Sequence, residues 1–214
     1  MNHPAARLVL GLALFVLLGW GVGELWISVV GSAELNAVRD VATQRTAVLT
    51  GVVRAPTWAG SAFLLVPLAL IACLAFARVG LRREALAVVI SLGGAMLISV
   101  WVKLLVSRPR PPIEHLQAVA GSSFPSGHTT QASSFWLSLV LALPATRASP
   151  KLTRVAAGLV MLIVLAVAAS RVYLGVHYPS DVIAGMLLGT GWAICVSRCL
   201  REPEPLRSLF DSMT

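Results

Sequence analysis

Charged side chains are scarce in this chain, and acidic ones are the scarcest. Of 214 residues only 12% are charged, nine of them acidic and 17 basic, whereas 57% are apolar and the mean hydropathy is +0.83. This composition excludes an ordinary soluble domain, and at about 20 residues per crossing the chain is long enough for five or six membrane spans. We therefore expect a polytopic helical membrane protein, with the lipid bilayer as its surroundings.

Cysteine is also rare, because Cys73, Cys195 and Cys199 are the three that the chain contains. All lie within or at the end of apolar runs, and their spacing matches no zinc site, so we expect no structural disulfide. The net charge of +8 does not indicate a nucleic-acid partner. Most basic residues flank apolar runs instead of forming one solvated face, which is typical of membrane topology and of attraction to anionic lipid.

Six apolar runs, each near the length of about 20 residues that crosses a bilayer, follow one another along the chain. They predict an all-α fold with six transmembrane helices in a single membrane-embedded domain, residues 1–214, in which residues 200–214 form a cytoplasmic tail. The runs are residues 8–30, 58–77, 85–106, 127–144, 154–172 and 181–199.

Basic residues are distributed unevenly between the two sides of these expected spans. Ten of the 17 lie on the side of the N-terminus and seven on the other side. By the positive-inside rule we expect both termini in the cytoplasm and a multi-pass protein of the cell's inner membrane. The ten are Arg7, Arg78, Arg82, Arg83, Arg147, Lys151, Arg154, Arg198, Arg201 and Arg207, and the seven are Arg39, Arg45, Arg54, Lys103, Arg108, Arg110 and Arg171.

Three polar clusters interrupt the apolar sequence, and the expected topology puts all of them at the outer face. They are residues 103–111 (KLLVSRPRP), 125–128 (PSGH) and 170–181 (SRVYLGVHYPSD). Ionisable groups in membrane segments are costly and mark functional sites. We therefore expect a site within the core 103–181 that faces the periplasm or the exterior.

The first cluster supplies cations. Lys103 lies near the outer end of its predicted helix, and Arg110 lies between two prolines, so the helix ends between them. The two can clamp one phosphate, the arginine bidentately and the lysine as a point charge. The alternative is that they are cations at a helix end that reach the headgroup region, and Arg108 fits this alternative better.

The second cluster begins a helix. Proline suits a first helical turn, while Ser126 and Gly127 leave backbone N–H groups open at the positive end of the helix dipole, a geometry that binds an anion. His128 then lies in the first turn, where it can donate a proton to a leaving oxygen. The alternative for a lone histidine at this position is an interfacial residue.

The third cluster pairs an imidazole with a carboxylate. His177 precedes a helix start, and Asp181 lies in its first turn, at a spacing that allows Nδ1–H of His177 to donate to the carboxylate. Such a bond leaves Nε2 as a free lone pair and stabilises positive charge on the ring, which suits a nucleophile. The alternative for Asp181 is a carboxylate that complements the helix dipole, and it does not exclude the first role.

Together the clusters resemble the signature of the type 2 phosphatidic acid phosphatase superfamily, K-x6-R-P, P-S-G-H and S-R-x5-H-x3-D. The sequence matches every signature position, including Ser170 and Arg171 at the start of the third part. The resemblance is close over residues 103–181 and extends to the first two helices only in general layout.

The resemblance implies a role for each signature residue. Lys103, Arg110 and Arg171 would hold phosphate oxygens, helped by Ser126 and the backbone of Gly127. His177 would attack phosphorus, oriented by Asp181, and His128 would protonate the leaving group; a phosphohistidine would form and be hydrolysed by water. Family members act without a metal or other cofactor, and the few carboxylates near the clusters would make a poor magnesium site.

We accordingly expect an integral membrane phosphatase that acts on a lipid phosphate or diphosphate. The candidates implied are undecaprenyl diphosphate, phosphatidylglycerol phosphate, phosphatidate and diacylglycerol diphosphate. Two alternatives stay open: a lipid phosphotransferase that uses the same intermediate, and a non-catalytic lipid-phosphate binder or transporter, although the latter would be expected to lose His177 or Asp181.

Other segments give weaker signals. Residues 31–57 are expected to form an outer loop with a short surface helix around Ala33–Leu49, and residues 1–33 alternatively resemble a cleavable signal peptide. Gly185 and Gly189 in the last helix permit close helix packing, either within one chain or between two copies. The sequence does not indicate an oligomeric state.

Overall fold

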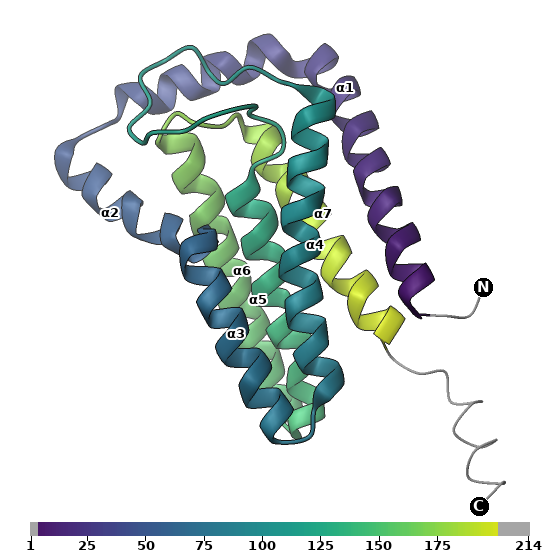
Figure 1. The fold of residues 1–214 in the computed structure, drawn as a ribbon. Helices are drawn as coiled ribbons and strands as arrows, with labels where there is room; N and C mark the ends of the chain where they lie inside the picture. Colours follow the sequence, from purple (N-terminus) through teal and green to yellow (C-terminus); the bar gives the residue numbers. More distant parts are fainter. Residues whose placement is uncertain (1–3, 201–214) are drawn as a thin grey trace, which may run out of the picture.

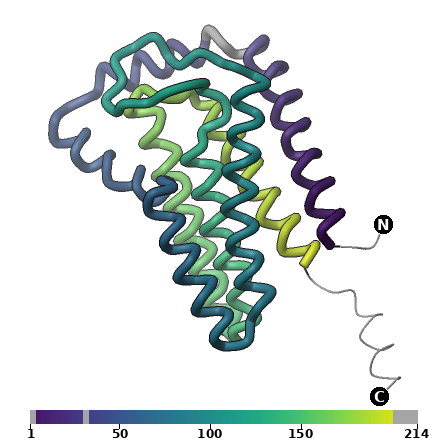
Figure 2. The backbone as a smooth tube through the Cα atoms, in the orientation of Figure 1, coloured from purple at the N-terminus to yellow at the C-terminus, as the bar shows by residue number. Residues whose placement is uncertain are grey.

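In the part of the chain that it describes, the computed structural model consists of helices and the loops that connect them. It gives the backbone of residues 4–200 and the side chains of residues 4–29 and 33–200 (Figure 2), so the expected tail from residue 201 lies outside the described residues. No strand occurs between residues 4 and 200, which confirms the predicted all-α class. The elements are α1 (Pro4–Thr43), α2 (Ala47–Thr57), the 3-10 turn η1 (Trp58–Gly60), α3 (Ala62–Arg78), α4 (Arg82–Val106), α5 (Gly127–Ala142), the 3-10 turn η2 (Leu143–Thr146), α6 (Pro150–Tyr173) and α7 (Pro179–Leu200).

The six predicted runs each correspond to a helix, and four of these helices are long and apolar enough to cross a membrane. They are the first part of α1 (Pro4–Val29), α4, α6 and α7. A fifth span results if α2 with η1 and α3, which meet at a bend of 43°, are taken as one broken span. The protein is therefore a multi-pass membrane protein, but six separate spans are not confirmed, because α5 has only 16 residues.

Helix α5 is the central helix of the bundle. It packs against α3, α4, α6, α7 and η1 (Figure 1). Small polar residues on it are buried. Ser134, for example, donates from its hydroxyl to the carbonyl of Ser91 in α4, at 2.8 Å. Small residues and hydroxyl-to-carbonyl bonds are the usual means of close helix contact where lipid replaces water.

Glycines permit the closest of these contacts. A Cβ on Gly185 would lie 2.9 Å from the carbonyl oxygen of Ser126, and one on Gly189 would overlap the carbonyl oxygen of Thr130, so α7 touches the backbone of α5 at both positions. The Gly185 and Gly189 motif therefore serves packing within one chain. In α1, Gly19 and Gly23 similarly meet Val102 and Phe124.

The segment 31–57 differs from its prediction as an outer loop. Helix α1 runs on without a break to Thr43, and after a bend its second part lies across one end of the bundle, above the ends of α4, α5, α6 and α7 (Figure 1). The reason is an apolar face: Val41 and Val53 pack on a small core of Tyr173, Leu174 and Val176. Polar bonds support it, because Arg45 donates from Nε to the carbonyl of Tyr173 and from Nη1 to that of Glu114, both at 3.0 Å.

Candidate active site

The covered end of the bundle is where the three polar clusters meet. Helices α4 and α6 end there and α5 and α7 begin there, so residues 103–111, 125–128 and 170–181 come to one place (Figure 1). The amide of Ser126 donates to the carbonyl of Asp181 at 2.9 Å, which joins the start of α5 to the start of α7. Lys103 donates to the carbonyls of Ser122 and Ser123, which joins the end of α4 to the loop before α5.

His177 and Asp181 lie at the centre of this end. His177 is 3% exposed and Asp181 is fully buried, and Nδ1 of the imidazole lies 3.4 Å from Oδ2 of the carboxylate. The same Oδ2 accepts a bond from the amide of Tyr178 at 2.9 Å and another from the hydroxyl of Ser123. The carboxylate is therefore held in place from several sides, with Oδ2 towards the imidazole.

Burial sets the protonation state of His177. It lowers the pKa of His177 to about 4, because removal from water disfavours the charged ring. The hydrogen bond and the negative charge of Asp181 act in the opposite direction and raise this pKa, and the positive charges of Lys103 and Arg171 lower it further. At neutral pH the imidazole is therefore uncharged and carries a nucleophilic lone pair.

The three signature cations all point at protein oxygens. Arg110 donates to the carbonyls of Val176, Ala120 and Gly121 at 2.7, 3.0 and 3.1 Å, so it joins two loops of the site. Arg171 is buried in the end of α6, where Nη1 donates to Thr57 Oγ1 at 2.8 Å and to the amide oxygen of Gln117, while Nε is buried with no partner among the described residues. A buried guanidinium with an unpaired N–H can still donate to an anion.

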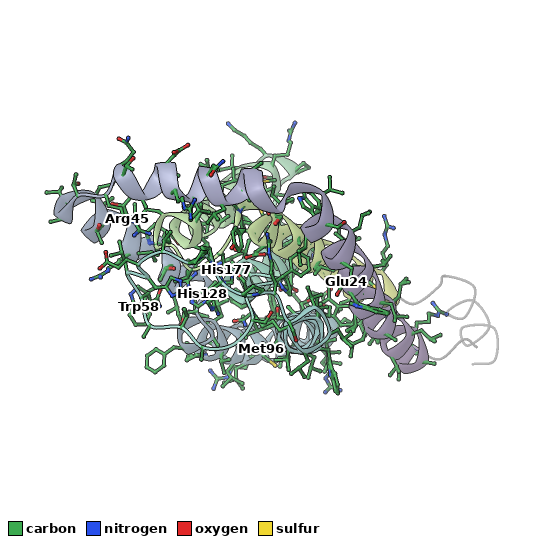
Figure 3. The ribbon with its side chains drawn as sticks, turned by 90° about the horizontal axis from the view of Figure 1, so that it is seen from above. Glu24, Arg45, Trp58, Met96, His128 and His177 are labelled. Atoms are coloured by element: carbon green, nitrogen blue, oxygen red, sulfur yellow. The ribbon has the colours of Figure 1, made fainter. Side chains whose placement is uncertain are left out.

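His128 lies on the wall of a cavity of about 260 Å³ at this end of the bundle. The cavity is lined by polar side chains, among them both partners of Arg171, and the two histidines lie near the middle of the bundle end in the view from above (Figure 3). Gly60 of η1 fits tightly behind His128, since a Cβ there would lie 2.7 Å from the carbonyl oxygen of His128. The other lining residues are Arg54, Thr57, Trp58, Ser61, Leu116 and Gln117.

Ser126 and Gly127 occupy the start of α5, as predicted from the proline before them. Ser126 is buried, its hydroxyl shares a hydrogen bond of 2.9 Å with Thr129 Oγ1, and its amide is used by the carbonyl of Asp181. Gly127 is the first helical residue, and a Cβ there would meet nothing nearer than Gln131 at 3.7 Å. The space around Gly127 at the helix start is therefore open.

Sequence reasoning missed several side chains of the site. Arg108 was expected to be a cation at a helix end, but it is 4% exposed and donates to Asp181 Oδ1 at 2.7 Å. It also donates to Glu34 of α1, a residue that carried no motif at all. The signal for Glu34 was weak: it is one of only nine acidic residues, and it lies in an expected loop. Ser123 and Gln117 had no signal beyond their place between the first two clusters, and Thr57, which lies far from every cluster in the sequence, had none.

Fold and site define a class of protein: a multi-pass helical membrane protein with a buried histidine and aspartate beside three cations at one end of its bundle. The family model of the PAP2 superfamily matches residues 84–204, and the chain belongs to this family. The resemblance seen in the three motifs is thereby confirmed.

Relatives of known name are phosphatases. Phosphatidylglycerophosphatase B of Bacillus subtilis (strain 168) is 33% identical over 110 residues, which cover 50% of this chain and 53% of that protein. Decaprenylphosphoryl-5-phosphoribose phosphatase of Mycobacterium tuberculosis (strain CDC 1551 / Oshkosh) is 37% identical over 128 residues, 57% of this chain and 63% of that protein. The aligned parts thus span less than two thirds of the length of these relatives.

Solved structures match over more of the chain. The crystal structure of a transmembrane PAP2 type phosphatidylglycerolphosphate phosphatase from Bacillus subtilis has a TM-score of 0.75 and 27% sequence identity, and the match covers 92% of this chain and 96% of that one. The structure of Aquifex aeolicus LpxE has a TM-score of 0.59 at 22% identity, over 78% and 94% of the two chains, and it shows the likeness of the fold alone.

Proposed function

We propose that this protein is a metal-independent membrane phosphatase that removes phosphate from a lipid phosphate or lipid diphosphate. The observation that carries the proposal is His177, a buried neutral imidazole with Asp181 at 3.4 Å and the charges of Lys103 and Arg171 close enough to affect its ionisation. A nucleophile beside fixed cations is what phosphoryl transfer requires, because its transition state carries negative charge on the phosphate oxygens.

The proposed reaction has two steps. In the first, Nε2 of His177 attacks phosphorus, the bond to the leaving oxygen breaks, and His128 gives that oxygen a proton. In the second, water attacks the phosphohistidine, gives its proton to His128, and inorganic phosphate leaves as His177 is freed. Lys103, Arg110 and Arg171 hold the phosphate oxygens, with the backbone of Gly127 at the helix start. Ser126, whose hydroxyl and amide are bonded to Thr129 and Asp181, positions this helix start instead.

Asp181 stabilises the positive charge that develops on the ring in the first step. Its Oδ2 lies on the Nδ1 side, so the proton stays on Nδ1 and the lone pair on Nε2 faces the phosphate. In this arrangement the bond of Ser123 to the same oxygen competes with His177, and attack by the imidazole favours a shorter contact between His177 and Asp181.

The proposed setting is the outer leaflet of the inner membrane. Six spans with both termini in the cytoplasm put the covered end of the bundle at the periplasm or the exterior, and the count of ten basic residues against seven supports this orientation. A lipid tail would enter from the bilayer between helices, while its headgroup lies at the cavity beside His128.

The names of the relatives support a lipid substrate, since they refer to phosphatidylglycerophosphate, a decaprenyl phosphosugar and undecaprenyl diphosphate. The experiment is phosphate release by purified, lipid-reconstituted protein in excess EDTA, beside His177→Ala. The panel is undecaprenyl diphosphate, phosphatidylglycerol phosphate, phosphatidate and diacylglycerol diphosphate.

Release that survives EDTA and disappears in His177→Ala supports the proposal and ranks the substrates. Transfer of phosphate to a second lipid instead of water, seen by product analysis, would make the protein a phosphotransferase. Tight lipid binding without either product would identify a binder.

A further inference from the structure

Arg108 makes as many hydrogen bonds as Arg110, although it is not one of the signature cations. Its Nη1 donates to Asp181 Oδ1 and to Ser180 Oγ, both at 2.7 Å, and its Nη2 donates to Glu34 Oε2 at 2.8 Å. Its guanidinium also lies 3.9 Å from the ring centre of Tyr178. A side chain with this many partners and 4% exposure has one position open to it.

Glu34 closes the network from the other side. It is 8% exposed, and besides Arg108 it accepts bonds from the hydroxyl of Ser180 at 2.7 Å and from the amide of Ser180 at the start of α7. It thereby accepts a backbone N–H that the first turn of a helix leaves unpaired, and it places negative charge at the positive end of the helix dipole. Helix α1 is thus bonded directly to the helix that carries Asp181.

The two oxygens of Asp181 have separate partners. Oδ1 is bonded to Arg108, whereas Oδ2 faces Ser123, Tyr178 and His177. If the carboxylate rotated, it would give up the short ion pair with Arg108. Breaking a buried ion pair leaves an uncompensated charge away from water, so the pair opposes rotation.

We propose that Arg108 and Glu34 are positioning residues of the reaction, which act on His177 through Asp181. Arg108 holds the carboxylate so that Oδ2 faces Nδ1, and Glu34 offsets part of the positive charge of Arg108 so that Asp181 keeps its pull on the imidazole. Through Glu34, the second part of α1 then helps to position the reacting groups of the site. This inference rests on the proposed function.

The charges of the network predict in which direction each substitution moves the pKa of His177. Arg108 carries one positive charge against the negative charges of Glu34 and Asp181, so the network has a net charge of about −1 beside the imidazole. Removing the charge of Arg108 raises the pKa of His177, because two carboxylates then favour the imidazolium; removing the charge of Glu34 lowers it. The other charged or titratable groups that act on the site are Lys103, Arg110 and Arg171, His128 near His177 and Arg39 near Tyr178.

The test follows the titration of His177 by NMR in protein labelled with 15N-histidine, in lipid nanodiscs. The variants are Arg108→Gln, Glu34→Gln and the double variant, and His177→Gln assigns the signal. We expect the titration to move up by about one pH unit in Arg108→Gln, down in Glu34→Gln, and back towards the wild type in the double variant. Turnover of the lipid panel is measured beside it, and kcat is expected to fall about 100-fold in both variants that lack Arg108, with KM changed less than about threefold.

Arg45→Gln is the matched control, since Arg45 also joins this segment to the outer loops but bonds only to backbone carbonyls of Tyr173 and Glu114. It is expected to lower thermal stability without moving the titration. The inference is overturned if Glu34→Gln leaves the His177 titration unchanged, or if Arg45→Gln moves the titration as far as Glu34→Gln does. If Arg108→Gln does not fold, the result for Glu34→Gln is sufficient to decide. If the wild type released no phosphate, the proposed function would be wrong, while the titration would still test whether Arg108 and Glu34 act on His177 through Asp181.

Discussion

At the scale of single residues, the burial of His177 makes a prediction about pH. Because its pKa is lowered to about 4, the neutral nucleophile is present above pH 4 and is lost as the pH falls through that value. We expect the acid limb of kcat/KM near pH 4, well below the value of about 6.5 for an exposed histidine. Two substrates whose phosphate groups ionise at different pH separate the enzyme's limb from the substrate's. A shared acid limb near 6.5 would show that His177 is not desolvated as described.

Arg110 gives a second prediction at this scale. Its fork bonds three carbonyls on two loops, and a lysine offers one point charge in its place. Arg110→Lys should therefore lower kcat/KM about 100-fold, measured by phosphate release. Arg45→Lys is the matched control, because Arg45 also bonds backbone carbonyls, those of Tyr173 and Glu114, but does not line the cavity beside His128, and it should keep activity within about threefold. Equal losses in the two variants would argue against a special role of the Arg110 fork.

Residue types and spacing predicted part of the site and missed part of it. The signature residues could be found because phosphoryl transfer needs a nucleophile, an acid and cations at fixed intervals, and the structure places His177 and Asp181 beside each other. Arg108 and Glu34 could not be paired in this way, since they lie 74 positions apart and only the fold brings them together. Nor does a motif show that Ser123 shares the carboxylate of Asp181.

At the scale of elements, the loop between α6 and α7 depends on one glycine. Gly175 has φ +77°, and a Cβ there would lie 2.8 Å from the carbonyl oxygen of Glu114. Gly175→Ala should cost about 1–3 kcal/mol from strain and crowding, and it should displace His177 two residues on. Thermal unfolding in detergent and turnover measure the two effects.

Gly80→Ala is the control for that variant, because Gly80 has φ +81° with open space around it. It should show the strain alone, with a smaller loss of stability and normal turnover. If Gly175→Ala behaved in the same way, the close approach at Gly175 would have no part in holding the site.

The bounds of helices were predicted well where apolar runs are long, and badly where a segment is helical because of its packing against other segments. The runs 85–106, 154–172 and 181–199 correspond to α4, α6 and α7 within a few residues. The segment 31–57 has mixed polarity, and its sequence indicated a loop with a short surface helix around Ala33–Leu49, whereas α1 and α2 make most of it helical. These helices are supported because Val41 and Val53 pack on the core of Tyr173, Leu174 and Val176 and because Glu34 and Arg45 bond to the neighbouring segments.

For the whole molecule, the proposed topology predicts that the end of the bundle with the site faces the exterior of the cytoplasmic membrane. A cysteine at Glu114, in the exposed loop near the site, should react with a membrane-impermeant maleimide added to intact spheroplasts, and one at Lys151, at the start of α6, should not. Both are placed in a background where Cys73, Cys195 and Cys199 are replaced. The reverse labelling pattern would put the site in the cytoplasm and refute the topology.

The proposed reaction passes through a covalent phosphate on His177 during turnover. The most direct measurement is rapid quenching of the reconstituted protein with 32P-labelled lipid diphosphate in EDTA, followed by analysis of protein-bound phosphate. The account predicts label that is stable to alkali, labile to acid and absent from His177→Ala, which also releases no phosphate. Phosphate release or protein label that persists in His177→Ala would contradict it.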